Sequence, residues 1–160
     1  MNINLTTELV GDVIAEALKH IHKKSEMQKI TVIQQDELLL AKMDARLIVQ
    51  VLINLLDNAI KYTPSDSQIT ITAKKDGNMI SVSVSDNGNG IADEQKSRVF
   101  DMFYTGTNKI ADSRRSIGLG LSLCKSIINA HGGEITITDN NPHGAVFTFT
   151  LPIGEVEIHE

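Results

Sequence analysis

Three segments of the chain repeat apolar residues at the spacing of an amphipathic helix. The first covers residues 5–24. The second starts at Asp44, a residue type that suits the N-cap, and ends before Pro64, which disfavours helical geometry in the residue preceding it. The third starts near Gly118 and ends at a pair of glycines that begins with Gly132, a natural C-terminal cap. Each apolar face predicts that its helix lies on a larger hydrophobic surface.

Alternating apolar and polar residues predict six short strands. They cover Ile30–Gln34, Leu38–Ala41, 69–73, 80–84, Glu134–Thr138 and Ala145–Leu151. Asp76-Gly77, between the third and the fourth strand, is a hairpin signal. Because four strands alternate on one side only, we expect helices to cover a single face of the sheet. The pattern therefore predicts a two-layer α/β sandwich, with about three helices on a mixed, mostly antiparallel sheet.

One long irregular segment interrupts this pattern. Residues 104–117 are polar and have no apolar period, and they separate a short helix expected over Asp93–Phe103 from the last helix. An irregular run of this length inside a compact domain is usually functional or mobile. We find no internal repeat and no inter-domain linker, so the 160 residues predict a single domain.

Composition and charge exclude several classes of function. The sequence has 15 Lys and Arg against 20 Asp and Glu, and its net charge of -5 argues against nonspecific binding to nucleic acid or to an anionic membrane. With no Trp, two Tyr and four Phe, it lacks the material for a base-stacking platform. The single cysteine, Cys124, cannot form an internal disulfide. Neither a signal peptide nor an apolar run of about 20 residues is found. These features predict a cytoplasmic protein.

Polar residues form a stripe along the second predicted helix. Gln50, Asn54, Asn58 and Lys61 stand at i, i+4, i+8 and i+11, and so share one helix face. Asn is a poor helix former, which suggests that the two asparagines serve a purpose there. Carboxamide oxygens are suitable ligands for Mg2+, and Lys61 could reach an anion that the metal also holds. The alternative, from spacing alone, is an ordinary solvated helix face.

Two glycine-containing segments are candidates for ligand contact. Residues 86–90, Asp-Asn-Gly-Asn-Gly, follow a predicted buried strand, where the carboxylate can accept a hydrogen bond and the glycines let the backbone approach a ligand. A plain turn is the alternative. Residues 116–121, Ser-Ile-Gly-Leu-Gly-Leu, open the last helix, whose free N–H groups suit phosphate. Lys109, Arg114 and Arg115 lie just before them. A cluster of charged residues in a loop is usually only solvated, but this one stands beside a helix start that suits phosphate.

In this order, the segments resemble the ATP-binding catalytic domain of bacterial sensor histidine kinases. That domain belongs to the Bergerat-fold superfamily, which also holds gyrase, MutL and the ninety-kilodalton heat-shock chaperone. The similar stretches are the N box at Gln50–Thr63, the G1 box at Asp86–Gly90, the F box at Phe100–Phe103, the G2 box at Gly118–Leu121 and the last strand at Gly144–Pro152. Within the family, residues 114–133 are most similar to KdpD-type potassium-responsive sensors.

The resemblance implies how the chain is organised. Residues 1–160 would form one catalytic domain with its core at 5–152. An ATP lid would cover about 104–117, and a tail would cover 153–160. The phosphoacceptor domain of a complete kinase would be absent.

The resemblance also implies a role for each matching position. Asn58 and Asn54 would bind Mg2+ at the ATP phosphates, and Lys61 would contact phosphate. Asp86 would accept a hydrogen bond from the adenine amino group, which selects an amino purine over a keto purine. The other implied contacts are Tyr62, Gly88, Gly90 and Ile91 around adenine, Lys109, Arg114 and Arg115 at the γ-phosphate, and the backbone N–H groups of Gly118, Leu119, Gly120 and Leu121 at the phosphates.

Four features depart from the family pattern. Thr105 stands where an arginine often follows the F-box aromatic residue, and Ala145 replaces a common threonine near adenine. Asn54 takes the place of the general-base glutamate of the superfamily's ATPases, so efficient ATP hydrolysis is not expected. No histidine stands in the phosphoacceptor pattern: His20 and His131 both lack the flanking residues of that motif.

The implied function is that of a histidine kinase catalytic domain. It would bind ATP and Mg2+ and donate the γ-phosphoryl group to a histidine on a separate dimerisation and phosphoacceptor domain, with a response regulator acting next in the two-component system. It would belong to the cytoplasmic portion of a membrane-anchored sensor. Alone, it is expected to be monomeric and not to autophosphorylate.

Two other functions remain open from the sequence. One is a stand-alone regulator of the anti-sigma serine kinase type, which acts mainly by binding a protein. The other is a superfamily ATPase, against which Asn54 argues.

Overall fold

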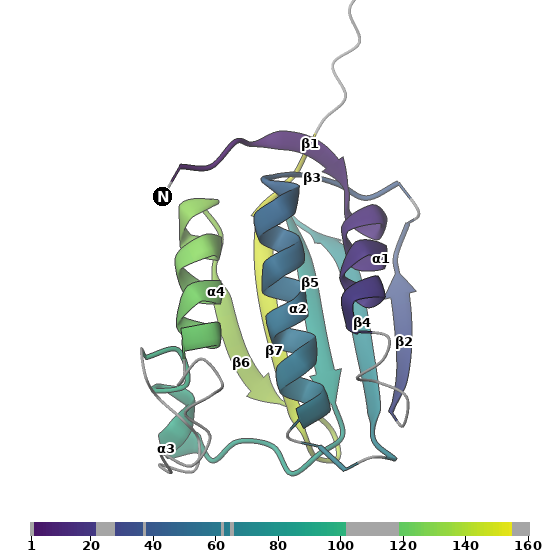
Figure 1. Cartoon of the computed structure of the whole chain (residues 1–160), viewed down its shortest axis with the longest axis vertical. Helices are drawn as coiled ribbons and strands as arrows, with labels where there is room; N and C mark the ends of the chain where they lie inside the picture. Colours follow the sequence, from purple (N-terminus) through teal and green to yellow (C-terminus); the bar gives the residue numbers. More distant parts are fainter. Residues whose placement is uncertain are drawn as a thin grey trace, which may run out of the picture.

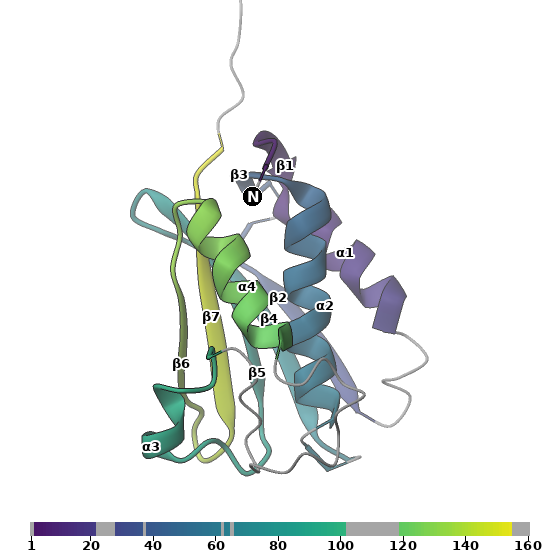
Figure 2. The same cartoon turned by 60° about the vertical axis from the view of Figure 1, so that its left-hand side comes forward.

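The computed structural model describes residues 2–21, 28–36, 38–61, 63, 64, 66–101 and 119–154. Its elements are β1 (Thr6–Leu9), α1 (Val10–Ile21), β2 (Lys29–Gln34), β3 (Leu40–Met43), α2 (Ala45–Lys61), β4 (Gln68–Asp76), β5 (Met79–Asp86), α3 (Asp93–Lys96), α4 (Leu119–Ala130), β6 (Ile135–Asp139) and β7 (Ala145–Pro152). Figure 1 shows α1, α2 and α4 side by side over the sheet, and the turned view of Figure 2 places all three on the same face. The predicted two-layer α/β sandwich is confirmed.

The main sheet has five strands in the order β2-β4-β5-β7-β6. Only β2 and β4 pair in parallel, and the other neighbours are antiparallel, so the sheet is mixed and mostly antiparallel as predicted. Ile71, Val84 and Phe147 are register partners across three strands, and all three are buried. Because side chains alternate along a strand, this row faces the helices and the intervening Ser and Thr residues face away. The core therefore lies between the sheet and the helix layer.

The structure corrects the predicted start of the first helix. Residues 6–9 form β1, which pairs antiparallel with β3 from Thr6↔Met43 to Leu9↔Leu40, and α1 begins only at Val10. The prediction was wrong because the free edge of β3, far along the chain, offers hydrogen bonds that override a local helical period. The strand predicted over Leu38–Ala41 is also displaced to Leu40–Met43. The Leu38 amide instead donates to Asp36 Oδ1 in a turn, and Leu38 is 74% exposed.

The predicted helix over Asp93–Phe103 is shorter than expected. Within the described residues of this segment, the helix α3 covers only Asp93–Lys96. The backbone hydrogen bonds that follow join residues three apart, as in Asp101 N to Arg98 O. Lys96 fixes this segment to the sheet, because its ammonium group pairs with Asp93 and lies 2.8 Å from Asp139 Oδ1 at the end of β6. These hydrogen bonds, to Asp139 first, raise the pKa of Lys96.

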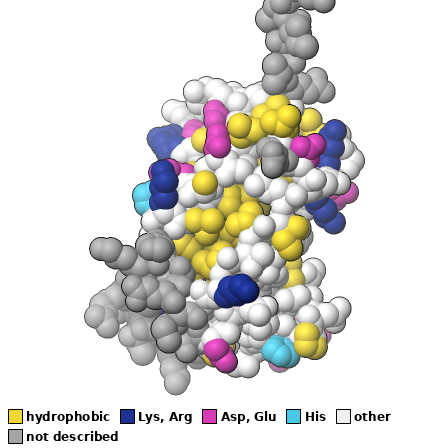
Figure 3. All heavy atoms as spheres, turned by 90° about the vertical axis from the view of Figure 1, so that its right-hand side faces the viewer, with side chains coloured by type: hydrophobic (Ala, Val, Ile, Leu, Met, Phe, Trp, Pro, Cys, Tyr) yellow, Lys and Arg dark blue, Asp and Glu magenta, His cyan; other side chains and the backbone are white. Residues whose placement is uncertain are grey.

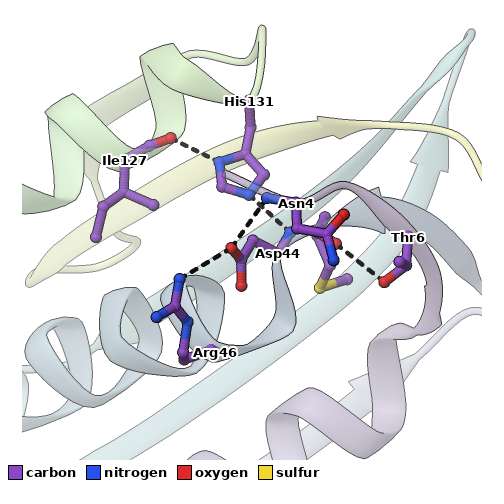
Figure 4. Close-up of polar contacts among 7 residues, drawn as sticks. Asn4, Thr6, Asp44, Arg46, Ile127 and His131 are labelled. Atoms are coloured by element: carbon purple, nitrogen blue, oxygen red, sulfur yellow. Dashed lines mark hydrogen bonds and ion pairs between the residues drawn. The ribbon is translucent and has the colours of Figure 1, made fainter. Parts of the chain in front are cut away.

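A buried polar cluster joins the start of α2 to the end of α4 (Figure 4). His131 Nε2 accepts a hydrogen bond from the Asp44 amide at 3.0 Å, and Nδ1 lies 2.7 Å from the Ile127 carbonyl oxygen. Since a carbonyl only accepts, Nδ1 carries the proton and the ring is neutral. The Asp44 carboxylate accepts from Arg46 and from the Asn4 amide; the Arg46 hydrogen bond is the main cause that lowers the pKa of Asp44, and burial opposes it. The two helices are thus held together at this end.

The side of the molecule that carries β2 has an apolar edge. Figure 3 looks at the side that carries β2, where apolar side chains gather between the charged ones. Val32 and Ile33 of this edge strand are 36% and 53% exposed. In Figure 1 this edge lies beyond α1, away from the neighbouring pair α2 and α4. It is therefore separate from the polar stripe of α2.

Candidate functional site

The polar stripe on α2 faces the start of α4. Asn54 Nδ2 donates to the Gly120 carbonyl oxygen at 3.4 Å, and Asn54 Oδ1 accepts from Gln50 Nε2 at 3.1 Å. The predicted one-turn spacing therefore brings Gln50 and Asn54 into contact. It also places Asn54 against the glycine-containing helix start, 66 residues further along the chain.

Asn58 lies one helical turn beyond Asn54 and differs from it in its contacts. Its side chain is half-buried, and the side-chain carboxamide forms no hydrogen bond with any other residue that the structure describes. Lys61, at the end of α2, is also half-buried. Asn58 therefore keeps an oxygen for a ligand, whereas the Asn54 amide is already engaged on both sides.

The Asp86 carboxylate is held by its own turn and by β7. Asp86 is 8% exposed, and its Oδ1 accepts from the Gly88 amide at 2.9 Å and from the Ala145 amide at 3.3 Å. Both hydrogen bonds reach the same oxygen. Within the described part of the chain, Oδ2 has no hydrogen-bond donor, so it is the atom that can accept one from a ligand.

Gly88 brings this turn close to the end of α2. A Cβ atom on Gly88 would lie 2.7 Å from Thr63 Cγ2, closer than real Cβ atoms come, and 3.2 Å from Asp86 Oδ1, which is a tight contact. Thr63 is itself fixed, because its hydroxyl donates to the Ala59 carbonyl at 2.6 Å. The close packing of the turn against Thr63 therefore requires glycine at position 88. Gly90, the other glycine of the turn, lies against the Gly144 carbonyl.

The remaining predicted residues divide into two groups. Ile91 is partly buried against the core beside the Asp86 turn, and the backbone of Leu119, Gly120 and Leu121 forms the first turn of α4. The first amides of a helix have no partner within it and form its positive end, which favours an anion. Tyr62, Lys109, Arg114, Arg115 and Gly118, together with the lid expected at 104–117, lie outside the described residues.

Comparison with known proteins shows the family. The family described as histidine kinase-, DNA gyrase B-, and HSP90-like ATPase matches residues 43–155, which is more than half of the chain. The chain belongs to this ATPase family. Within it, the sensor protein KdpD of Clostridium acetobutylicum is 41% identical over 150 residues, 94% of this chain but 17% of that protein. The chain therefore spans about a sixth of the length of this curated relative.

Solved structures place the chain among histidine kinase catalytic domains of the ATPase family. The catalytic domain of histidine kinase ThkA matches with a TM-score of 0.79 and 31% identity, over 94% of this chain and 98% of that domain. ThkA in complex with the response regulator protein TrrA matches with a TM-score of 0.76 and 32% identity, over 94% of this chain and 42% of that one. The resemblance found in the sequence is thus confirmed. No helix in the described ranges has the length and apolarity to cross a membrane.

Sequence reasoning missed several residues that shape the candidate site of this ATPase-family domain. Asn140 and His143, in the β6–β7 loop, donate to the main chain of the Asp86 turn. Asn87 Oδ1 accepts from the Gln68 amide at 2.8 Å and so ties the same turn to the start of β4. Each partner is distant in sequence, and an asparagine or a histidine in a loop carries no recognisable signal by itself.

A separate cavity of about 470 Å³, lined by Gln35 and other residues at the far end of the sheet, contains none of the predicted site residues.

Cys124 of α4 should be inert in the folded domain. It is fully buried, its Sγ lies 3.8 Å from the Val51 carbonyl oxygen, and burial raises the pKa of the thiol to about 12. We expect a thiol reagent such as DTNB to label the folded domain only at the rate of unfolding, but to label it at once in concentrated guanidinium chloride. Rapid labelling of the folded domain would contradict this assignment.

Because the pKa of the Cys124 thiol falls on unfolding, the free energy of unfolding should decrease as the pH rises from about 8.5 towards 12.

Proposed function

We propose that this domain binds Mg-ATP between α2, the Asp86 turn and the start of α4, and donates the γ-phosphoryl group to a histidine on a separate phosphoacceptor domain. One observation carries the proposal. The buried Asp86 carboxylate has Oδ1 occupied by two backbone amides and Oδ2 without a described donor. A carboxylate held in this way accepts a hydrogen bond from the amino group of adenine and rejects the keto group of guanine.

The residues present fit the nucleotide and its metal. Asn58 offers a carboxamide oxygen without a described partner, which is a ligand type that Mg2+ accepts. When bound, Mg2+ neutralises charge on the phosphate oxygens. Lys61 would contact phosphate, and the first amides of α4 would donate to phosphate oxygens. Tyr62, Lys109, Arg114 and Arg115 would add contacts around adenine and the γ-phosphate.

Asn54 favours transfer to a partner over hydrolysis. Its amide donates to the Gly120 carbonyl and accepts from Gln50, and an amide cannot take a proton from water. It therefore positions α4 relative to α2 without acting as a general base. The domain itself would act by positioning and by charge complementarity, which are the main requirements of phosphoryl transfer.

The partners follow from this role. The acceptor histidine would come from a dimerisation and phosphoacceptor domain, and a response regulator would receive the phosphoryl group next. The structure of ThkA in complex with the response regulator protein TrrA supports a response regulator as a partner. We further propose that the isolated domain is a monomer, and that in the full-length kinase it lies in the cytoplasmic portion of a membrane-anchored sensor.

Calorimetry with Mg-ATP tests the binding site. We expect Asn58→Ala and Asp86→Ala each to weaken binding by at least about tenfold, because each removes an oxygen that is proposed to contact the ligand or its metal. Asn78→Ala, in the exposed β4–β5 hairpin, is a matched control and should bind as the parent does. If both site variants bind as tightly as the parent, the site assignment is wrong.

Radiolabelled ATP tests the direction of transfer. We expect no label on histidine when the chain is incubated alone, and label on the added helical domain when one that carries an acceptor histidine is present. Label retained on a histidine of the isolated chain would contradict the proposed division of labour. Steady release of phosphate without a partner would favour the ATPase alternative instead.

A further inference from the structure

The loop between β6 and β7, residues 140–144, lies against the back of the Asp86 turn. Asn140 Nδ2 donates to the Asp86 carbonyl oxygen at 2.7 Å, and His143 Nδ1 lies 2.9 Å from the Gly88 carbonyl oxygen. Because a carbonyl only accepts, His143 Nδ1 carries the hydrogen. Two side chains of one loop therefore hold two carbonyl groups of the turn.

The loop is itself held in a defined shape. The Asn140 amide N–H donates to the Gly144 carbonyl at 3.0 Å, and Asn140 Oδ1 accepts from the Asn141 amide at 2.9 Å. The Asn140 side chain thus uses its oxygen within the loop and its nitrogen on Asp86, which fixes the orientation of the amide group. Asn140 therefore transmits the shape of the loop to the turn.

The two bonds fix the peptide planes on either side of Asn87-Gly88. Asp86 O belongs to the peptide before that pair and Gly88 O to the peptide after it. With both planes set, the Gly88 N–H points at Asp86 Oδ1, where it meets the Ala145 amide. The direction of Asp86 Oδ2 then follows from the loop, although neither Asn140 nor His143 donates to the carboxylate.

We propose that Asn140 and His143 are positioning residues for purine selection, which hold the Asp86 turn in the shape that aims Oδ2 at the adenine amino group. This inference rests on the proposed function, in which Asp86 recognises adenine. A turn without these two donors would let the carboxylate rotate. The adenine-specific hydrogen bond would then weaken more than the contacts common to all purine nucleotides.

Asn140→Asp tests the first donor. The aspartate keeps an oxygen for the Asn141 amide but sets an acceptor against the Asp86 carbonyl. We expect the Kd for Mg-ATP to rise about tenfold and the Kd for Mg-GTP to change less, so that the ATP-to-GTP preference falls. Asn78→Asp, which adds the same charge in an exposed hairpin, should change neither Kd.

His143 offers a rescue experiment, because Asn places an amide nitrogen where His has Nδ1. We expect His143→Ala to lower the ATP-to-GTP preference about threefold to tenfold and His143→Asn to restore it. His20→Ala, on the exposed face of α1, is the control and should behave as the parent. A merely structural role would alter the melting temperature but would not move this ratio.

The outcomes separate this inference from the proposed function. If the parent binds Mg-ATP while Asn140→Asp and His143→Ala leave both Kd values unchanged, or change them by the same factor, the inference is wrong. If the parent itself binds no Mg-ATP, the proposed function is wrong. A lower preference in both variants, with recovery in His143→Asn, supports the inference.

Discussion

Replacing Asp86 with asparagine should lower the affinity for Mg-ATP by about tenfold to a hundredfold, the range of one hydrogen bond to a charged group. The asparagine keeps Oδ1 to accept from the Gly88 and Ala145 amides, so the turn should retain its shape. Its Nδ2, in place of Oδ2, would face the amino group of adenine, and two donors cannot bond. The keto oxygen of guanine can accept from that nitrogen, so the preference for ATP over GTP should fall as well.

The control for this substitution is Asp76→Asn, at the exposed end of β4. It removes the same charge, but from a position outside the proposed site, and should leave both nucleotide affinities as they are. Calorimetric titration of the parent and the two variants with Mg-ATP and Mg-GTP makes the comparison. An Asp86→Asn protein that binds Mg-ATP as tightly as the parent would remove Asp86 from the site.

Gly144→Ala should destabilise the domain by at least about 3 kcal/mol, a large effect for one methyl group. Gly144 has φ +116, and a Cβ there would lie 2.0 Å from the Asp86 carbonyl oxygen, far inside contact distance. The added Cβ is fixed to the backbone at Gly144 and meets the backbone carbonyl of Asp86. Neither backbone segment can move away without opening the pairing between the ends of β5 and β7. Nucleotide binding should be lost together with stability, because Asp86 would have to move.

Gly77→Ala separates the clash from the cost of the backbone conformation. Gly77 has φ +63, but no atom lies within 4 Å of the position of its Cβ. This control should cost about 1 kcal/mol, the usual penalty for a side chain in the left-handed region. Urea unfolding of both variants measures the difference in the free energy of unfolding. Equal losses in the two variants would show that the close approach of Gly144 to Asp86 is not what demands glycine.

Local patterns in the sequence predicted the elements that depend on local physics. The apolar period of α2 and the alternation of β4 and β5 reflect which face is buried, and the structure has these elements close to where they were expected. β1 was not found, because Thr6–Leu9 becomes a strand only through pairing with β3. A single-sequence pattern contains no information about such a distant edge.

The same division applies to the candidate site. Asn54, Asn58 and Asp86 could be found because a helical stripe and a carboxylate at a strand end have chemical meaning by themselves. Asn140 and His143 could not, because their roles depend on carbonyl groups more than 50 residues away. Residues with a recognisable chemical pattern, whether proposed for ligand contact as Asn58 and Asp86 are or for positioning as Asn54 is, were therefore accessible from the sequence, and the loop residues behind the Asp86 turn were not.

The buried ring of His131 has a consequence for the chemistry of this chain. A histidine accepts a phosphoryl group through a ring nitrogen that has an available lone pair. In His131 that nitrogen is Nε2, which already accepts a hydrogen bond from the Asp44 amide. Nδ1 bears the proton and donates it in a hydrogen bond to the Ile127 carbonyl oxygen, and the residue is only 2% exposed. Any phosphohistidine detected on this chain must therefore be at another position. In peptide mapping, the peptide that contains His131 serves as an internal negative control.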